Sequence, residues 1–342
     1  MEIPEHLTDI FTFENLLRAY KKASKNKRNK KDVSKFREHL YQNIYRIVKT
    51  FKHGKYPEIK YHSFVVEQPK RREVWATTFE IRVIMHCFCD EFLTDFFEQF
   101  YSERNCACRK GMGPDYAGNC LKKDIINHFT KYGNSGYVLK ADIHHYFQSI
   151  DHTILKDSLS IILPFGEIRD FLFYIIDSFS PGLPLGNQTS QLLALYYLSP
   201  VDEYVRNQQN LDYTRYMDDF AAIIRTKQDA ALMLNEVGNI VKNQLHLKLN
   251  GKTTIQTLKN GIGFLGWNYS LKETGKLTKR RMKNKKQNAM RKMKQAIYLY
   301  QNGRIDSKNY SNRVMGIFAT LDKGDAYEFK RALVKLQYKN HD

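Results

Sequence analysis

The chain has 342 residues, of which 42% are hydrophobic, with a formal net charge of +19 and a sequence pI near 9.5. This length can bury a sizeable core, and the excess of cations predicts a polyanionic partner such as RNA or DNA. No apolar run reaches the roughly 18 residues of a membrane span, and the N-terminus lacks the basic and apolar regions of a signal peptide, so we expect a cytoplasmic protein with no membrane partner.

The first 60 residues are predicted to be largely helical. One face of this segment carries four hydrophobic side chains: Phe11, Phe13, Leu16 and Leu17. The run from Lys21 to Lys31 follows, and it is too charged to pack in a core. Two interpretations stay open for this run, a solvated loop and an arm that grips RNA.

The chain contains five cysteines: Cys87, Cys89, Cys106, Cys108 and Cys120. A chain this long does not need a disulfide framework. Two C-x-C pairs could form a zinc site, but Cys87 and Cys89 lie in an apolar, helical run from Ile81 to Phe97 and would face different sides. Reduced, partly buried thiols are therefore the favoured interpretation.

A strand pattern runs from Tyr137 to Ile143 and carries an acid, Asp142, near its end. Asp151 follows shortly afterwards and is predicted to cap a helix that starts near Thr153. The segment therefore reads as a strand, a short connection and a helix, with a carboxylate at the strand end.

Two further short strands, Tyr213 to Met217 and Phe220 to Arg225, flank Asp218 and Asp219. Adjacent aspartates are poor strand residues but good turn residues, so the pattern predicts a hairpin with both acids at its tip. Strand alternation predicts that Met217 faces the opposite side from Tyr216. Taken alone, the pair could also be a solvated turn.

Neighbouring carboxylates repel each other, so a fold that holds them together favours a bound cation. Asp142, Asp218 and Asp219 supply the oxygen ligands that two Mg²⁺ ions prefer, with a backbone carbonyl near Ile143 and with Mn²⁺ as a substitute. Two such ions would support phosphoryl transfer. His144 and His145 are less suited to these hard cations.

A second basic stretch runs from Lys276 to Lys294 and includes three methionines: Met282, Met290 and Met293. It is predicted to be one basic amphipathic helix that lies along a nucleic-acid duplex. A solvated face and a docking surface for a partner stay open as alternatives.

These blocks, in this order, resemble a reverse transcriptase, an RNA-directed DNA polymerase, over roughly residues 60 to 270. The resemblance implies an α+β right-hand polymerase fold. Residues 1–60 would form a basic helical extension and 61–136 the fingers with part of the palm. Residues 137–270 would form the palm, an antiparallel sheet with helices, and 271–342 a short, basic helical thumb.

The resemblance also implies a set of nucleotide-binding residues. Glu67 to Arg72 resembles the fingers that bind the triphosphate, and Gly182 to Gly186 resembles the loop under the templating base pair. Phe147 stands where the family places the residue that excludes a ribose 2′-OH. The implied residues are Lys70, Arg72, Arg82, Phe147, Leu185, Gly186 and Gln191. Arg72 and Arg82 could also be simple surface charges, although guanidinium groups suit triphosphate oxygens.

Three later blocks resemble the catalytic and primer-binding parts of the family. Tyr216 to Asp219 matches the Y-x-D-D motif, and Leu249 to Thr253 resembles the next palm motif. Gly263 to Trp267 resembles the primer grip. The implied catalytic residues are Asp142, Asp218, Asp219 and Lys252, the last as a general acid. The implied primer and template contacts are Tyr216, Gly263, Phe264, Leu265 and Gly266.

One position indicates a subfamily. Many reverse transcriptases carry glutamine where this chain has Leu185, and the run from Leu185 to Gln191 fits the [I/V/L]-G-x-x-x-S-Q pattern of diversity-generating retroelement enzymes. Ala107 to Gly113 also resembles a stretch of those enzymes. In that family the aliphatic residue accompanies misreading of template adenines, and a loss of about 1.4 kcal/mol alters discrimination roughly tenfold. A packing change without effect on fidelity stays open.

The resemblance implies that a bacterial or phage-encoded enzyme copies a structured template-repeat RNA, from a DNA or RNA primer, into adenine-mutated cDNA that diversifies a target gene. A small basic accessory protein is the implied partner. Group II intron-like, retron and abortive-infection reverse transcriptases stay open, although the chain ends soon after the predicted thumb, which disfavours the intron type. A non-catalytic RNA-binding module is disfavoured because all three acids are present.

Overall fold

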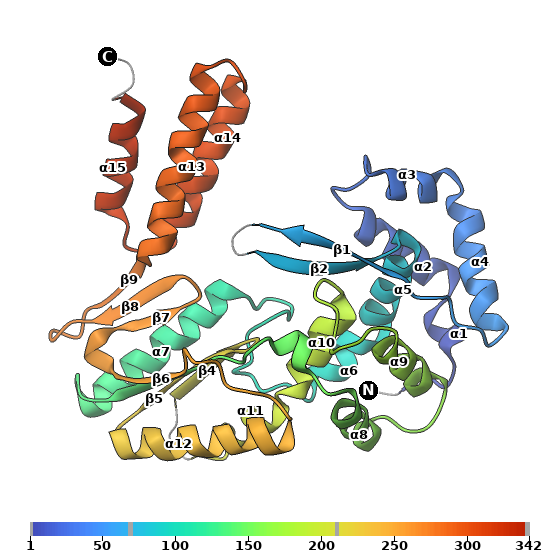
Figure 1. Ribbon diagram of the computed structural model, residues 1–342, viewed down its shortest axis with the longest axis horizontal. Helices are drawn as coiled ribbons and strands as arrows, with labels where there is room; N and C mark the ends of the chain where they lie inside the picture. Colours follow the sequence, from blue (N-terminus) through green and yellow to red (C-terminus); the bar gives the residue numbers. More distant parts are fainter. Residues whose placement is uncertain (1–2, 68–70, 209–211, 339–342) are drawn as a thin grey trace.

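The computed structural model describes residues 3–67, 71–208 and 212–338. It combines helices with three antiparallel sheets of two, four and three strands. In Figure 1 the N-terminal helices and the C-terminal helices stand at opposite ends of the molecule, and the four-stranded sheet lies below the C-terminal helices.

Four helices make up the N-terminal part: α1 (Leu7–Ile10), α2 (Phe13–Ser24), α3 (Lys31–Glu38) and α4 (Leu40–Lys52). Thr12 caps α2, because its Oγ1 accepts a hydrogen bond of 3.2 Å from the Asn15 amide. Phe11 is buried and stacks on Phe51 at 4.0 Å between ring centroids. The predicted helical N-terminus is thus confirmed, with Phe11 and Leu16 in the core.

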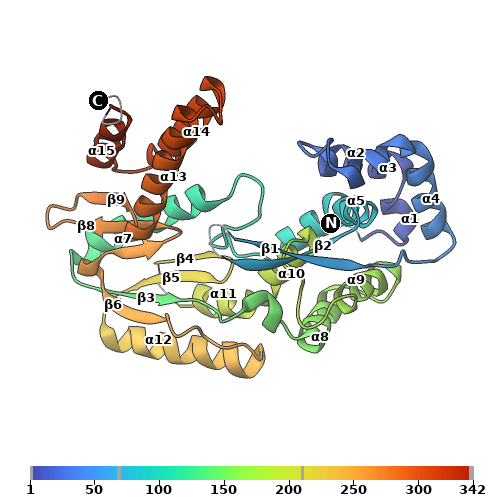
Figure 2. The same ribbon diagram turned by 45° about the horizontal axis from the view of Figure 1, so that its top comes forward.

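A two-stranded hairpin follows, formed by β1 (Tyr61–Val66) and β2 (Arg72–Thr77). Residues 62–66 are exposed. Figures 1 and 2 show the hairpin extending from the N-terminal helices toward the C-terminal helices. Its base is anchored on the core through Trp75, which packs edge-on against Phe179.

The apolar run after the hairpin is helical, as predicted. It consists of α5 (Phe79–Phe88), a π-helical turn (Cys89–Leu93) and α6 (Thr94–Glu98). Cys87 and Cys89 are both buried, and all five cysteines are free thiols. Cys108 is exposed and the other four are buried.

The central sheet has the strand order β4-β5-β3-β6, with every neighbouring pair antiparallel. Its strands are β3 (Tyr137–Ala141), β4 (Asp212–Tyr216), β5 (Asp219–Ile224) and β6 (Thr254–Thr257). Alternate residues of β5 belong to two different cores: Phe220, Ala222 and Ile224 face one, whereas Ala221 and Ile223 face the other. The sheet is therefore covered on both faces, which explains why β5 is continuously apolar.

Two helices, α7 (Pro114–Tyr132) and α12 (Lys227–Asn239), pack on this sheet. The chain between β3 and β4 forms α8 (His152–Ile162), α9 (Glu167–Asp177), α10 (Gln188–Tyr197) and α11 (Ser199–Arg206). A 3₁₀ turn (Tyr146–Ser149) precedes α8, and a π-helical turn (Ile240–Gln244) continues α12. Asp151 caps α8 as predicted, since its carboxylate accepts hydrogen bonds from the Thr153 and Ile154 amides. Figure 2 shows α7 and α12 on opposite sides of the sheet.

A three-stranded sheet joins α7 to the C-terminal helices. It contains β7 (Ile262–Phe264), β8 (Trp267–Leu271) and β9 (Leu277–Arg281), and it is preceded by a 3₁₀ turn (Leu258–Asn260). The C-terminal helices are α13 (Lys283–Gln301), α14 (Ser307–Leu321) and α15 (Tyr327–Tyr338). They stand above this small sheet in Figure 1.

The prediction of a single helix from Lys276 to Lys294 is therefore wrong in its first part. β9 pairs with β8 through a turn that contains Gly275, whose φ is +78°. Thr278 and Lys279 are buried in the sheet although their side chains are polar. Pairing with β8 makes residues 277–281 a strand, and the local charge pattern does not contain that partner. The helix begins only at Lys283.

None of the helices in the described ranges combines the length and the hydropathy that crossing a membrane requires.

Candidate active site

The β4–β5 turn holds the most distinctive residues of the sequence. Tyr216 pairs with Asp219, so Met217 and Asp218 form a two-residue turn and Asp219 opens β5. Met217 has a φ of +56°, the left-handed region, and its Sδ lies 4.0 Å from the exposed Cys108 Sγ. Met217 is thus a turn residue, which corrects the expectation that it alternates along the strand with Tyr216.

Asp142 meets this turn because of the strand order. It follows β3 directly, and the last residue of β3, Ala141, pairs with Phe220 of β5. The antiparallel register therefore sets the end of β3 beside the start of β5. The negative charge of Asp142 acts directly on Asp218, and all three acids are partly buried. The strand register therefore places Asp142 next to Asp218 and Asp219, as the sequence predicts.

Burial changes the acidity of the turn carboxylates. Removal from water, together with the smaller effect of the negative charges of Asp142 and Asp219, raises the pKa of Asp218 from 3.8 to about 6. Removal from water also raises the pKa of Asp219 to about 6, although Lys140 opposes this shift from 3.6 Å. The site therefore concentrates negative charge that one lysine only partly offsets.

These residues fit a hard divalent cation. The Oδ1 atom of Asp219 is buried without a hydrogen-bond partner, which is costly unless another group binds it. Carboxylate oxygens are the ligands that Mg²⁺ prefers. Across residues 3–67, 71–208 and 212–338, no three His, Cys, Asp or Glu side chains form a ready-made metal cage. The fit thus rests on ligand chemistry and on an Asp219 oxygen that has no hydrogen bond, although the Lys140 ammonium lies 3.6 Å from it.

The backbone around Asp142 ties a second predicted motif to the site. Ile143 forms an antiparallel bridge with Leu249. The Asn250 amide donates to the Asp142 carbonyl at 2.7 Å, and the Asn250 side chain accepts from the Lys252 amide at 3.1 Å. Two hydrogen bonds, both made by Asn250, therefore connect Asp142 to the main chain of Lys252. Lys252 itself is exposed.

The predicted loop at residues 182–186 packs on Phe147. The Leu183 amide donates to the Phe147 carbonyl at 2.7 Å. Gly182 has a φ of +64°, and a Cβ atom there would lie 2.2 Å from the same carbonyl oxygen. Only glycine fits this approach, so the loop sequence is set by contact with the turn that carries Phe147.

The far side of the loop contacts the β1–β2 hairpin. The Leu185 carbonyl accepts a hydrogen bond of 3.1 Å from the Trp75 amide. A Cβ atom at Gly186 would lie 3.0 Å from a methyl group of Val74. Leu185 is partly buried, and Gln191 is partly buried in the first turn of α10. The loop thus contacts the Phe147 main chain at its start and strand β2 at its end.

The three predicted triphosphate-binding residues have different surroundings in the sequence and the structure. Lys70 lies outside the described residues. Arg72 is exposed at the start of β2. Arg82 is ion-paired with Asp32 of α3, and its guanidinium lies 5.3 Å from the centroid of the Phe79 ring. Arg82 therefore links α5 to α3 here, a partner that the sequence did not reveal.

The predicted primer grip is the tight β7–β8 hairpin. Leu265 and Gly266 form its turn, with φ values of +46° and +82°. A Cβ atom at Gly266 would lie 3.4 Å from an Arg281 guanidinium nitrogen and 3.3 Å from the Lys285 stem. The side chain of Phe264 is fully buried in the core beside α7, so the predicted primer contact of this residue could involve only its main chain.

The sequence interpretation missed Arg215, which precedes Tyr216 in β4 and is 1% exposed. Its Nε donates to Asp202 of α11 at 2.8 Å, and a second nitrogen also bonds that carboxylate. Another nitrogen donates to the Met217 carbonyl at 2.8 Å. The signal was a charged residue inside the apolar strand pattern, which indicates a buried ion pair.

A second arginine supports the neighbouring loop. The Arg215 amide bonds the Arg104 carbonyl at 3.0 Å, and the Arg215 carbonyl accepts from the Cys106 amide at 2.9 Å. Arg109 donates to the Ser102 and Asn105 carbonyls at 2.7 and 2.9 Å. Arg109, which lies in the stretch from residue 107 to 113, thus stabilises the segment around Asn105 that pairs with β4.

The two raised pKa values predict how stability depends on pH without divalent ions. The folded chain holds protons on Asp218 and Asp219 up to about pH 6, whereas the unfolded chain releases them near 3.8. Stability from these groups therefore falls as pH rises through this window and is lowest above it. We expect the D218N/D219N variant to have a higher Tm than the parent at about pH 7 and a similar Tm near pH 4.

Thermal unfolding in a chelator, followed by titration with Mg²⁺, measures both effects. Mg²⁺ should raise the Tm of the parent, because it binds only the folded site, and should leave the variant unchanged. An equal Tm for parent and variant at every pH would contradict the charge repulsion.

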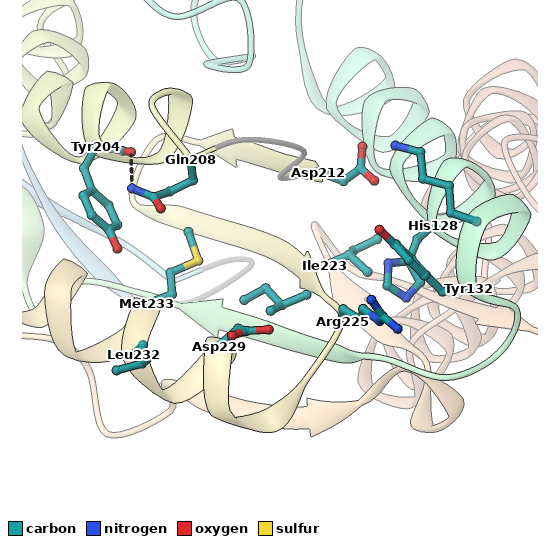
Figure 3. Close-up of a pocket in the computed structure, with 12 residues that line it drawn as sticks. His128, Tyr132, Tyr204, Gln208, Asp212, Ile223, Arg225, Asp229, Leu232 and Met233 are labelled. Carbon is teal, nitrogen blue, oxygen red and sulfur yellow. Dashed lines mark hydrogen bonds between the residues drawn. The ribbon is translucent and has the colours of Figure 1, made fainter.

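A cavity of about 400 Å³ lies away from the three acids. Figure 3 shows Tyr132 above Arg225, whose guanidinium is 5.0 Å from the ring centroid, and Met233 of α12 at the opposite end of the pocket, below Gln208. The cavity mixes acids, bases and apolar groups without convergent chemistry, so the carboxylate turn is the better candidate site.

Comparison with known proteins identifies the family of this chain. A family model described as reverse transcriptase (RNA-dependent DNA polymerase) matches residues 29–269. No match was found among curated proteins. Among solved structures, the chain is similar to apo telomerase from Candida tropicalis, truncated from its C-terminal domain. The TM-score is 0.49, with 13% identity, over 64% of this chain and 54% of that chain. The chain spans about half the length of that telomerase chain.

The family match covers the part of the chain that forms the candidate site. Its range contains Asp142, the β4–β5 turn and the 182–186 loop. The predicted α+β right-hand fold, an antiparallel sheet with helices, is confirmed, and so is the predicted family. Because the model covers well over half of its residues, this chain belongs to the reverse transcriptase (RNA-dependent DNA polymerase) family.

Proposed function

We propose that this chain is an RNA-directed DNA polymerase that adds deoxynucleotides to the 3′-OH of a DNA or RNA primer. The observation that carries the proposal is the meeting of Asp142, at the end of β3, with Asp218 and Asp219 at the β4–β5 turn. Membership of the reverse transcriptase family supports the same reaction.

Asp142 and Asp218 would hold two Mg²⁺ ions, with Asp219 and the Ile143 carbonyl assisting and with Mn²⁺ as a substitute. When bound, the ions supply charge neutralisation at the attacking and leaving oxygens of phosphoryl transfer. The protein contributes the fixed positions of the carboxylates, which pre-organise the site before substrate arrives.

Other residues would position the substrates. Arg72, with Lys70, would bind the triphosphate, and Arg82 could join them only by releasing Asp32. Phe147 would exclude a ribose 2′-OH from a backbone position that Leu183 fixes. The exposed Lys252 would protonate the leaving pyrophosphate.

The primer end would lie near Tyr216 and the turn of the β7–β8 hairpin. Gly263, Leu265 and Gly266 offer backbone groups there, with Arg281 beside them. Phe264 would act only through its main chain, because its side chain is buried. The same proposal assigns the extension to residues 1–60, the fingers to 61–136, the palm to 137–270 and the thumb to 271–342.

We further propose the diversity-generating type, with errors at template adenines, a structured template-repeat RNA, a small basic accessory protein and a cytoplasmic site of action. The run from Leu185 to Gln191 supports this type. Leu185 lies between the hairpin and the Phe147 turn, where a lost amide would remove one polar check on the nascent base pair.

The test is primer extension on a mixed-sequence RNA template with Mg²⁺ and the four dNTPs, followed by sequencing of the cDNA. The proposal expects cDNA whose errors concentrate opposite template adenines. Faithful cDNA would assign the enzyme to another lineage. Absence of product, even with the template-repeat RNA and the accessory protein added, would refute the polymerase itself.

Substitution of Leu185 by glutamine should make the enzyme more accurate. The Leu185 main chain already bonds Trp75, so the new amide changes the side chain without removing that contact. A gain of about 1.4 kcal/mol in discrimination would lower errors opposite adenine about tenfold. Error rates from sequenced cDNA measure the change, with L185V as the matched aliphatic control. Equal error spectra for L185Q and L185V would show that this position only packs.

A further inference from the structure

The basic loop, residues 21–31, spans the end of α2, its connection to α3 and the first residue of α3. It holds seven cations and no acid: Lys21, Lys22, Lys25, Lys27, Arg28, Lys30 and Lys31. The sequence alone could not decide between a solvated loop and a binding surface. Three structural observations favour a binding surface.

The first observation is that the connection is a folded turn. The Lys27 amide donates to the Ser24 carbonyl at 3.0 Å, and the Lys30 amide donates to the Lys27 carbonyl at 2.9 Å. Asn26 adopts the left-handed conformation, with a φ of +60°, and Ser24 beneath the turn is buried. The cations therefore stand on a defined backbone, which lowers the entropy lost on binding.

The second observation is that most of this charge is not neutralised. Lys22 bonds Asp90 at 3.0 Å, and the nearby Asp32 is already paired with Arg82. In the described part of the chain, the other six cations of the basic loop have no acidic partner, and all six are exposed. Clustered like charges repel one another, so an anion bound here would relieve repulsion.

The third observation is the shape and lining of the surface. A hollow of about 700 Å³ is lined only by residues of the basic loop, which contribute cations and the amides of Asn26 and Asn29. The residue before α3, Lys30, gives that helix no side-chain cap, so the first amides of α3 add positive potential.

The position of the loop indicates what it could reach. Figures 1 and 2 show the α2–α3 connection on the side of the N-terminal helices that faces the C-terminal helices. The β1–β2 hairpin extends in the same direction below it. A nucleic-acid strand approaching the palm past the hairpin would therefore pass the basic loop.

We propose that the basic loop binds the phosphate backbone of the single-stranded RNA template before that RNA reaches the active site. The inference rests on the proposed polymerase function. Protein interfaces rely on aromatic or aliphatic anchors and are depleted in lysine, whereas the exposed residues of this loop are Lys, Arg and Asn. Phosphates need only such cations, and the contact would be independent of sequence.

The test compares K25A/K27A/R28A with K227A/K242A/K259A. The control removes three exposed cations from α12 and the segments after it, and Figure 2 shows α12 on the side of the central sheet away from the C-terminal helices. Fluorescence anisotropy, without dNTPs, measures binding of two labelled template–primer duplexes. One template ends at the first templating base, and the other carries a long single-stranded 5′ extension.

The loop variant should lose affinity for the extended template and keep affinity for the short one. Each lost contact to single-stranded RNA lowers the slope of log K against log salt by about 0.7, so three contacts lower it by about 2. The parent should accordingly lose about 16-fold more affinity than the variant between about 50 and 200 mM salt. The control variant should follow the parent.

Three outcomes would overturn the proposal. They are an unchanged salt slope, an equal loss of affinity for both templates, and competition by polyglutamate as strong as competition by single-stranded RNA, which would point to an acidic protein. Because binding is measured without nucleotide addition, template binding by an inactive parent would refute only the polymerase function. Unchanged Tm values would show that the exposed substitutions leave the fold intact.

Discussion

Replacement of Asp218 by asparagine is expected to lower the rate of nucleotide addition by about a thousandfold or more, since loss of a metal-binding carboxylate removes several kcal/mol of transition-state stabilisation. The side chain interacts with the charges of Asp142 and Asp219, so asparagine keeps the shape while removing the charge that two cations require. Primer extension under single-turnover conditions measures the rate. D157N, which removes an exposed carboxylate from α8, is the matched control and should keep full activity.

The same substitution should not unfold the protein. Burial holds the pKa of Asp218 near 6, so the charged carboxylate is destabilising at neutral pH when no cation is bound, and the neutral amide relieves that strain. A variant that is stable and inactive supports a direct catalytic role. Rapid extension by stable D218N, at a rate within a few-fold of the parent, would remove Asp218 from the mechanism.

Replacement of Asp202 by alanine is expected to cost about 3–5 kcal/mol of stability, because it leaves the Arg215 guanidinium buried without its counter-ion. Asp202 is 4% exposed and Arg215 is 1% exposed, so water cannot replace the lost carboxylate. Urea denaturation measures the change as a lower midpoint. A midpoint equal to that of the parent would show that the buried pair contributes little.

A second variant separates stability from catalysis. The double replacement D202L/R215M removes both charges, and such swaps are often neutral or stabilising because neither charge is left alone. It also removes the hydrogen bond from Arg215 to the Met217 carbonyl, which fixes the turn that carries Asp218. We therefore expect near-parental stability with a lower kcat and a higher Mg²⁺ requirement. Parental kcat and Mg²⁺ dependence in this variant would show that Arg215 only supports the fold.

Local sequence signals were sufficient for several parts of this structure. The β4–β5 hairpin, the strand that ends beside Asp142 and the Asp151 cap follow from short patterns of apolar, turn-forming and capping residues. Such features depend on neighbours within a few positions, so the sequence carries them directly. The residue types at the turn also indicate a hard cation, because oxygen ligands are chosen by chemistry rather than by fold.

Contacts between segments far apart in the chain could not be predicted from local sequence patterns. β9 has the composition of a basic helix but pairs with β8, and Arg82 resembles a free cation but pairs with Asp32. Phe264 sits in a motif expected at a primer yet fills the core beside α7. In each case a partner outside the local segment determines the state of the residue, and the local pattern does not contain that partner.

The sequence by itself determined the three carboxylates, the hairpin that carries two of them and the family to which the motifs belong. Only the tertiary structure decided how they are held. The β3–β5 register sets Asp142 beside the turn, and the buried Arg215, paired with Asp202, fixes the turn carbonyl. The physical reason is that burial and ion pairing arise between segments far apart in the chain, where low dielectric makes an unpaired charge costly and a matched pair specific.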